Sequence, residues 1–72
     1  MGILSNISKN DAVRVFKKYG YILDHKTGSH MILYHKSKPT LSIPDHKELA
    51  PGLIRGLIRK RGLTVDEFLE AK

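Results

Sequence analysis

Histidines are the side chains in this sequence best suited to chemistry, because imidazole exchanges a proton near neutral pH and can serve as a general acid or base. The chain has four of them in 72 residues. His30 stands apart because it directly follows Gly28 and Ser29, where the pattern predicts a tight turn opening into a strand. We therefore take His30 as the candidate catalytic residue. The alternative is a ring that only packs at the end of a small sheet.

RNA cleavage is a reaction that such a turn can support. The nucleophile, the 2′-hydroxyl, belongs to the substrate, so the protein needs a base, help for the leaving 5′-oxygen and groups that stabilise a charged phosphorane. His30 can move the proton, while Lys26, Ser29 and the amides around Gly28 can contact the phosphate. His30 is expected to lie beside Lys26.

Two other kinds of site fit the sequence less well. A metal centre needs three or four converging ligands, and His30 and His35 fall on opposite faces of a strand by parity. A triad of Asp24, Ser29 and His30 fails on the same ground, because neighbouring strand residues point to opposite faces. We expect neither a metal nor a triad.

Charge points to a polyanionic partner. Thirteen Lys and Arg stand against seven Asp and Glu, for a net charge of +6, and the pI is near 9.8. Part of this charge lies in one expected helix, where Arg55, Arg59 and Lys60 can face phosphates. The absence of cysteine and of any long apolar run predicts a cytoplasmic location and no membrane contact.

The first half of the chain predicts a helix followed by three strands. Ser8 can cap a helix over residues 9–19. Residues 21–26 and 30–36 then form the hairpin, with Gly28 free to take a positive φ, and residues 40–44 form a third strand.

The hairpin register stays open in the sequence. A two-residue loop would pair Lys26 with Ser29 and set His25 opposite His30, whereas a three-residue loop would pair His25 with Met31. Both faces of the second strand carry apolar side chains. We expect Ile32 to point inward, which would place His30 at the rim of the core.

The second half predicts two helices. Pro51 suits the first helical position, Gly62 ends the helix, and the pairs at residues 53–54 and 57–58 form its apolar stripe. Thr64 and Glu67 have the spacing of a capping box, so a short helix should begin at Val65. The chain is thus one α+β domain, residues 1–72, with a three-stranded antiparallel sheet. The segment 53–68 also mimics a helix-turn-helix, so DNA binding is an alternative.

Several of these motifs, in this order, resemble the HicA toxins, RNA-cleaving proteins of toxin–antitoxin pairs. The similarity covers nearly the whole chain and rests on a set of short matches: Gly20-Tyr21, Gly28-Ser29-His30, Ile43-Pro44-Asp45-His46, Glu48 to Gly52, Leu57-Ile58-Arg59 and Gly62 to Leu69. The resemblance implies a fold like the double-stranded-RNA-binding domain, a catalytic role for His30 and a HicB-type antitoxin as partner. His46 matches a second recurrent family position, so the resemblance makes it a second catalytic candidate after His30.

These observations together predict a metal-independent endoribonuclease that cleaves mRNA without a cofactor. Its RNA contacts are expected at Lys26, Gly28, Ser29, Arg55, Arg59 and Lys60. The alternatives are a non-catalytic RNA-binding module of the same fold, a helix-turn-helix DNA binder and a protein-interaction module.

Overall fold

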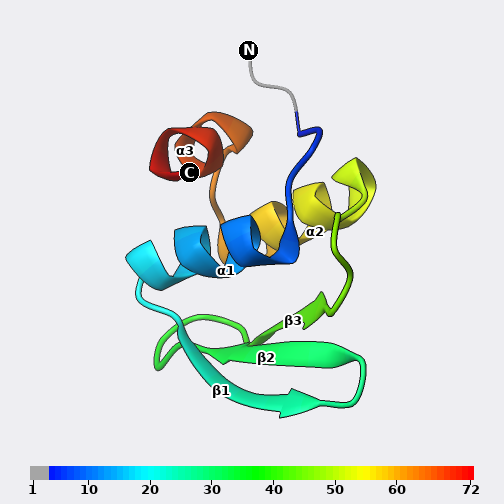
Figure 1. Cartoon of the computed structure of the whole chain (residues 1–72). Helices are drawn as coiled ribbons and strands as arrows, with labels where there is room; N and C mark the ends of the chain where they lie inside the picture. The colour runs from blue at the N-terminus through cyan, green and yellow to red at the C-terminus, as the bar shows by residue number, and fades with distance from the viewer. Residues whose placement is uncertain (1–3) are drawn as a thin grey trace.

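The computed structural model describes residues 4–72 and has the predicted order of elements, helix, three strands, helix and short helix (Figure 1). They are α1 (Lys9–Lys18), β1 (Ile22–Thr27), β2 (His30–Tyr34), β3 (Leu41–Pro44), α2 (Pro51–Arg61) and α3 (Val65–Ala71). The strands form one antiparallel sheet in the order β1-β2-β3. The α+β class and the likeness to a double-stranded-RNA-binding domain are confirmed.

Local sequence signals set the helix boundaries. Ser8 caps α1, where its hydroxyl accepts from the Asp11 N–H and the Asp11 carboxylate accepts from the Ser8 N–H. The same N–H lowers the pKa of Asp11, because it stabilises the ionised form. Thr64 and Glu67 form the expected capping box of α3. Gly62 ends α2 in the left-handed conformation, at φ 87°.

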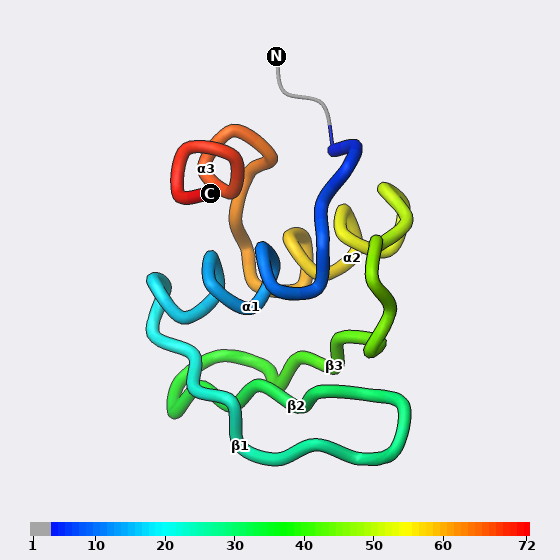
Figure 2. Tube along the Cα trace, in the orientation of Figure 1, coloured from blue at the N-terminus to red at the C-terminus, as the bar shows by residue number. Residues whose placement is uncertain are grey.

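The molecule is layered. Helices α1 and α2 lie over one face of the sheet, and α3 packs on the far side of these two helices (Figures 1 and 2). Among residues 4–72, no helix lies over the other face (Figure 1). Residues 4–8 pass across the helix layer, and the Leu49 N–H donates to the Ile7 carbonyl at 2.8 Å.

Our expectation that Ile32 points inward is wrong. Met31 and Leu33 are buried under the helices, whereas Ile32 is half-buried on the helix-free face. Pairing with β3 explains the choice, since Met31 and Leu33 lie opposite Ile43 and Leu41, both fully buried. Neighbouring strands share an apolar face. The clear alternation of apolar and polar residues in β3 therefore decides which side chains of β2 point toward the helices, although both faces of β2 carry apolar residues.

The hairpin register also differs from both alternatives. Thr27 pairs with His30 around a two-residue Gly28-Ser29 loop, and His25 pairs with Ile32. A β-bulge at Asp24 shifts the register between Leu23 and His25. We expected that Gly28 could take a positive φ, but it does not. Among the described glycines, a positive φ occurs at Gly20 and Gly62.

The core joins the helices to the covered sheet face. Phe16 lies at its centre, with ring centroids 5.8 Å from Tyr21 and 5.6 Å from Phe68. Tyr21 is buried and its hydroxyl donates to the Pro39 carbonyl, so it has a packing role. Leu53, expected in the apolar stripe of α2, is instead 37% exposed, because the buried side of that helix is formed by residues 54, 57 and 58.

Candidate functional site

The hairpin end of the sheet carries the candidate catalytic residue. His30 opens β2 on the helix-free face and is half-buried. Its Nδ1 lies 3.0 Å from the Ser29 Oγ, so our expectation that these neighbours cannot engage each other is wrong. The parity argument fails because Ser29 lies in the turn and not on the strand. A hydroxyl can donate or accept, so Ser29 can orient the ring in either neutral tautomer.

Asp45 forms hydrogen bonds and ion pairs at the same end of the sheet, on the side that the helices cover. Its N–H donates to the Ser29 carbonyl at 2.8 Å, and its carboxylate accepts from Lys26 at 2.8 Å and also from Lys9 of α1. The hydrogen bonds from Lys26 and then Lys9 lower the pKa of Asp45 to about 2. The backbone and carboxylate of Asp45 therefore connect the turn, the end of β1 and the start of α1.

This ion pair places Lys26 away from the position expected for it. Lys26 pairs with Met31 and so belongs to the covered face, whereas His30 pairs with Thr27 on the open face. Lys26 therefore does not lie beside His30 on one surface. It can meet a phosphate near the turn only from the other side of the hairpin.

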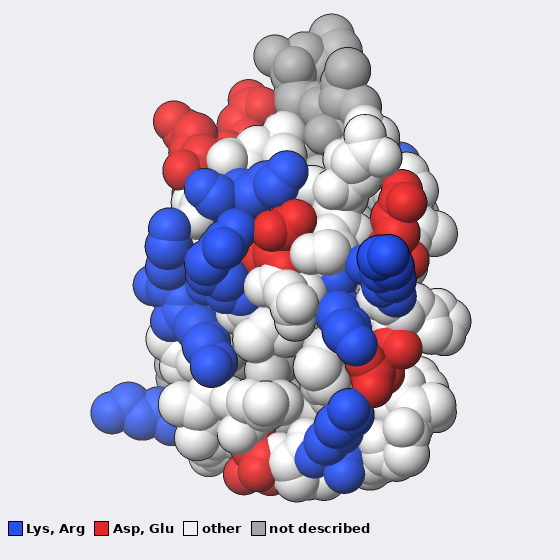
Figure 3. Space-filling view, in the orientation of Figure 1, with Lys and Arg blue, Asp and Glu red and all other residues white. Residues whose placement is uncertain are grey.

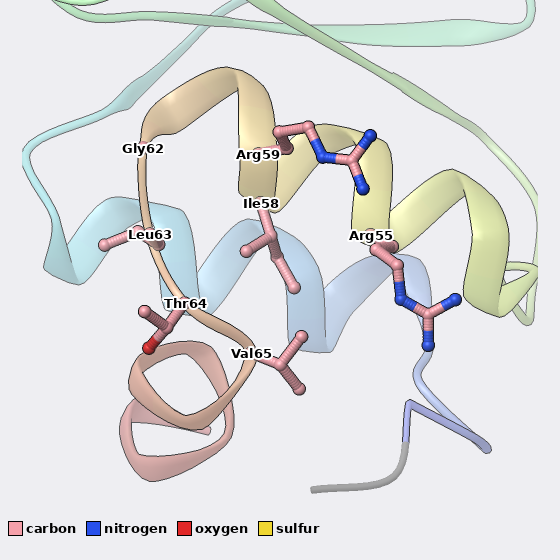
Figure 4. Close-up of a pocket in the computed structure, with 7 residues that line it drawn as sticks. All are labelled: Arg55, Ile58, Arg59, Gly62, Leu63, Thr64 and Val65. Carbon is pink, nitrogen blue, oxygen red and sulfur yellow. The ribbon is translucent and has the colours of Figure 1, made fainter.

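The expected basic contacts on α2 are spread along the molecule. Helix α2 begins at the end where the hairpin turns and runs away from it (Figures 1 and 2), so Arg59 and Lys60, in its last turn, lie toward the opposite end. Arg55 and Arg59 extend from one side of the helix, beside a shallow groove that continues to Val65 (Figure 4). An RNA that met both these groups and His30 would have to follow the length of the molecule.

Positive charge is also present on the face where α1 is in front. Figure 3 shows Lys and Arg side chains in two groups on this face, one on the left and one toward the hairpin end, where acidic atoms lie among them. The acidic side chain that contacts Lys9 and Lys26 is Asp45. Part of the net charge at this end is thus neutralised within the protein.

His46 lies in the loop after β3 and is exposed. It directly follows Asp45, whose backbone is tied to the turn, so His46 lies at the same end of the sheet as His30. Within residues 4–72 its ring makes no hydrogen bond that would fix its direction. The sequence-based expectation for His46 therefore stays a prediction.

Sequence reasoning did not single out His25, which lies on the same open face as His30. Its Nδ1 is 2.7 Å from the Asp24 Oδ2, and both side chains are about half exposed. The two-residue loop considered above would have put His25 on the face of His30 as their direct pair, whereas the observed register puts His25 opposite Ile32, diagonal to His30 on that face. Alternation alone could not have given this diagonal placement, because the register shifts at the bulge at Asp24.

The open face carries the imidazoles of His25 and His30, and each ring is oriented by a hydrogen bond to its Nδ1. Among residues 4–72, no group of three or more His, Cys, Asp and Glu is placed to hold a metal ion. No helix in the described part of the chain has the length and apolarity to cross a membrane.

The fold and the site define a class, a small α+β domain of double-stranded-RNA-binding type with a histidine at its hairpin turn. A family model described as the HicA toxin of bacterial toxin–antitoxin systems matches residues 10–63. The chain belongs to this HicA family. No curated protein matches it.

Proposed function

We propose that this chain is a metal-independent endoribonuclease that cleaves mRNA, with His30 as a catalytic residue. The observation that supports the proposal most is the placement of His30, on a helix-free face with its ring oriented by Ser29. Membership of the HicA family of toxins adds support. The net charge of +6 suits a polyanionic substrate.

The chemistry follows from the substrate's own hydroxyl. The His30 Nε2 takes the proton of the 2′-hydroxyl, and the 2′-oxygen attacks the adjacent phosphorus while the bond to the 5′-oxygen breaks. A second group gives a proton to the leaving 5′-oxygen, so the products are a 2′,3′-cyclic phosphate and a free 5′-hydroxyl. The amide and hydroxyl of Ser29 and the amide of Gly28 can donate hydrogen bonds near the phosphorane.

RNA is held by basic and turn residues. We assign contacts to Lys26, Gly28, Ser29, Arg55, Arg59 and Lys60, with His46 as a further candidate near the reacting phosphate. The arginines of α2 bind the strand at a distance from the cut, because the helix runs away from the hairpin. Their role is to hold the substrate and not to move protons.

Cleavage of single-stranded RNA in EDTA tests this proposal. The parent protein should cut the RNA and leave cyclic phosphate ends, whereas His30→Ala should cut at least about 100-fold more slowly, the usual contribution of a general acid or base. Lys17→Gln, an exposed change on α1, is the matched control and should cut like the parent. RNA with 2′-O-methyl groups should resist cleavage, because its nucleophile is blocked.

Other outcomes would replace the proposal. Binding of RNA without cutting by the parent would favour a non-catalytic RNA-binding module of the same fold. Tight binding of duplex DNA, lost in Arg55→Ala but not in His30→Ala, would favour the helix-turn-helix alternative. No affinity for either nucleic acid at low salt would favour a protein-interaction module.

We further propose that a HicB-type antitoxin inhibits the enzyme by covering His30. The open face offers apolar contacts to such a partner, since Ile22 is 57% and Tyr34 46% exposed and the two lie opposite each other. An acidic surface on the antitoxin would be complementary to the basic chain and would speed the encounter.

A further inference from the structure

Two histidines lie diagonally across β1 and β2 on the helix-free face. His25 pairs with Ile32 and Thr27 pairs with His30, so His25 and His30 are diagonal neighbours in the ladder. Such positions are about 7–8 Å apart, within reach of large side chains. A phosphate can therefore lie between the two rings.

Each ring is anchored through its Nδ1 atom. The Asp24 carboxylate holds His25 at 2.7 Å, and the Ser29 hydroxyl holds His30 at 3.0 Å. Within residues 4–72 neither Nε2 atom makes a hydrogen bond. Both rings thus keep Nε2 available to a ligand.

The β-bulge explains how Asp24 can reach the ring of its own neighbour. Adjacent residues of a regular strand point to opposite faces. Asp24 has no partner in the ladder, because the register shifts between Leu23 and His25 at this position. Bulges re-aim side chains in this way and are common beside active sites.

We propose that His25 is the second proton-transfer residue of the cleavage reaction, an inference that rests on the proposed ribonuclease function. His30 Nε2 removes the 2′-hydroxyl proton as the 2′-oxygen bonds to phosphorus. His25 Nε2 gives a proton to the 5′-oxygen as its bond to phosphorus breaks. One proton is taken up and one is released, so no co-reactant is needed.

The partners of the two rings decide which histidine is the acid. An ionised carboxylate only accepts hydrogen bonds, so the Asp24 carboxylate holds a proton on Nδ1 of His25. The exchangeable proton of His25 is therefore on Nε2, where it can be donated. The Ser29 hydroxyl can accept from Nδ1 of neutral His30, which leaves the Nε2 lone pair free to act as base.

A sulfur-substituted substrate separates the acid from other roles. An RNA with sulfur in place of the bridging 5′-oxygen has a thiolate leaving group, which departs without a proton. His25→Gln should cut ordinary RNA at least about 100-fold more slowly than the parent, but should cut the sulfur-containing RNA at close to the parent rate. His30→Ala should be slow on both substrates, and Lys17→Gln should match the parent on both.

Two results would overturn this assignment. Parent-like cutting of ordinary RNA by His25→Gln would show that the ring is not needed, and equal slowing on both substrates would show a binding or packing role. If the parent cuts and depends on His30 but not on His25, only this inference fails. If the parent cuts neither substrate, the ribonuclease proposal itself fails.

Discussion

At the scale of single residues, Asp45 links three elements through its backbone and side chain. The side chains of Lys26 and Lys9 donate to its carboxylate, and its N–H donates to Ser29, next to His30. These contacts favour the ionised carboxylate and lower the pKa of Asp45 from 3.8 to about 2. The residue therefore helps to set where the turn before His30 lies.

The pKa shift of Asp45 predicts how stability depends on pH. Because the folded-state pKa is below the unfolded one, the unfolded state binds the proton more readily, and the contribution of Asp45 is lost as pH falls from about 4 to about 2. Asp45→Asn should be less stable than the parent at pH 6, and this difference should shrink through that window. Urea unfolding followed by circular dichroism at each pH measures it.

The control for this comparison is Asp66→Asn, an exposed residue in the first turn of α3. At pH 6 Asp66→Asn should lose less stability than Asp45→Asn, because Asp66 forms no ion pair within residues 4–72. A constant difference between Asp45→Asn and the parent from pH 6 to pH 2 would contradict the role given to the ion pairs.

At the scale of elements, the connection from α1 to β1 depends on a glycine. Gly20 has φ 96°, and a Cβ built on it would lie 2.8 Å from the Nε2 of His35. The His35 ring in turn packs edge-on against Tyr21, with centroids 5.0 Å apart. This turn has little room for a side chain because the end of β2 packs against it.

Alanine substitutions at two glycines should therefore have opposite effects. Gly20→Ala should destabilise the fold by about 1–3 kcal/mol, through its left-handed backbone and the contact with His35. Gly56→Ala should stabilise it by up to about 1 kcal/mol, because Gly56 is exposed inside α2 with open space around it. Urea midpoints of both variants measure the difference, and equal shifts would refute the argument.

At the scale of the whole molecule, the helices cover one sheet face and leave the other open. The open face carries His25, His30 and the exposed apolar pair of Ile22 and Tyr34. A partner that covered this face would bury apolar surface and block both imidazoles at once. The net charge of +6 would favour an acidic partner.

This arrangement predicts where an antitoxin binds. Tyr34→Ala should weaken binding of a HicB-type antitoxin by at least about 1 kcal/mol, since aromatic side chains often dominate interfaces. Leu53→Ala, an exposed apolar change on α2, should leave the affinity unchanged. Calorimetric titration of each variant measures both, and a larger loss in Leu53→Ala would place the antitoxin on the helices. Higher salt should slow association in every case.

The sequence by itself determined the features that depend on neighbouring residues. The Ser8 cap of α1, the capping box of α3, the proline that starts α2 and the glycine that ends it were predictable, because each acts within one turn of the chain. Family membership could also be inferred from short motifs in order. The position of His30 beside a tight turn followed from the same local signals.

Only the tertiary structure decided which groups meet across the sheet. Strand register decides which sheet face Ile32 lies on. It also decides that His25 and His30 are diagonal neighbours and that Lys26 can pair with Asp45. Pairing with β3 fixes the register of β2 through contacts between residues that are distant in sequence. The bulge at Asp24 fixes that of β1 by breaking its alternation. A shift of one residue turns every side chain to the other face, so local patterns could not settle it.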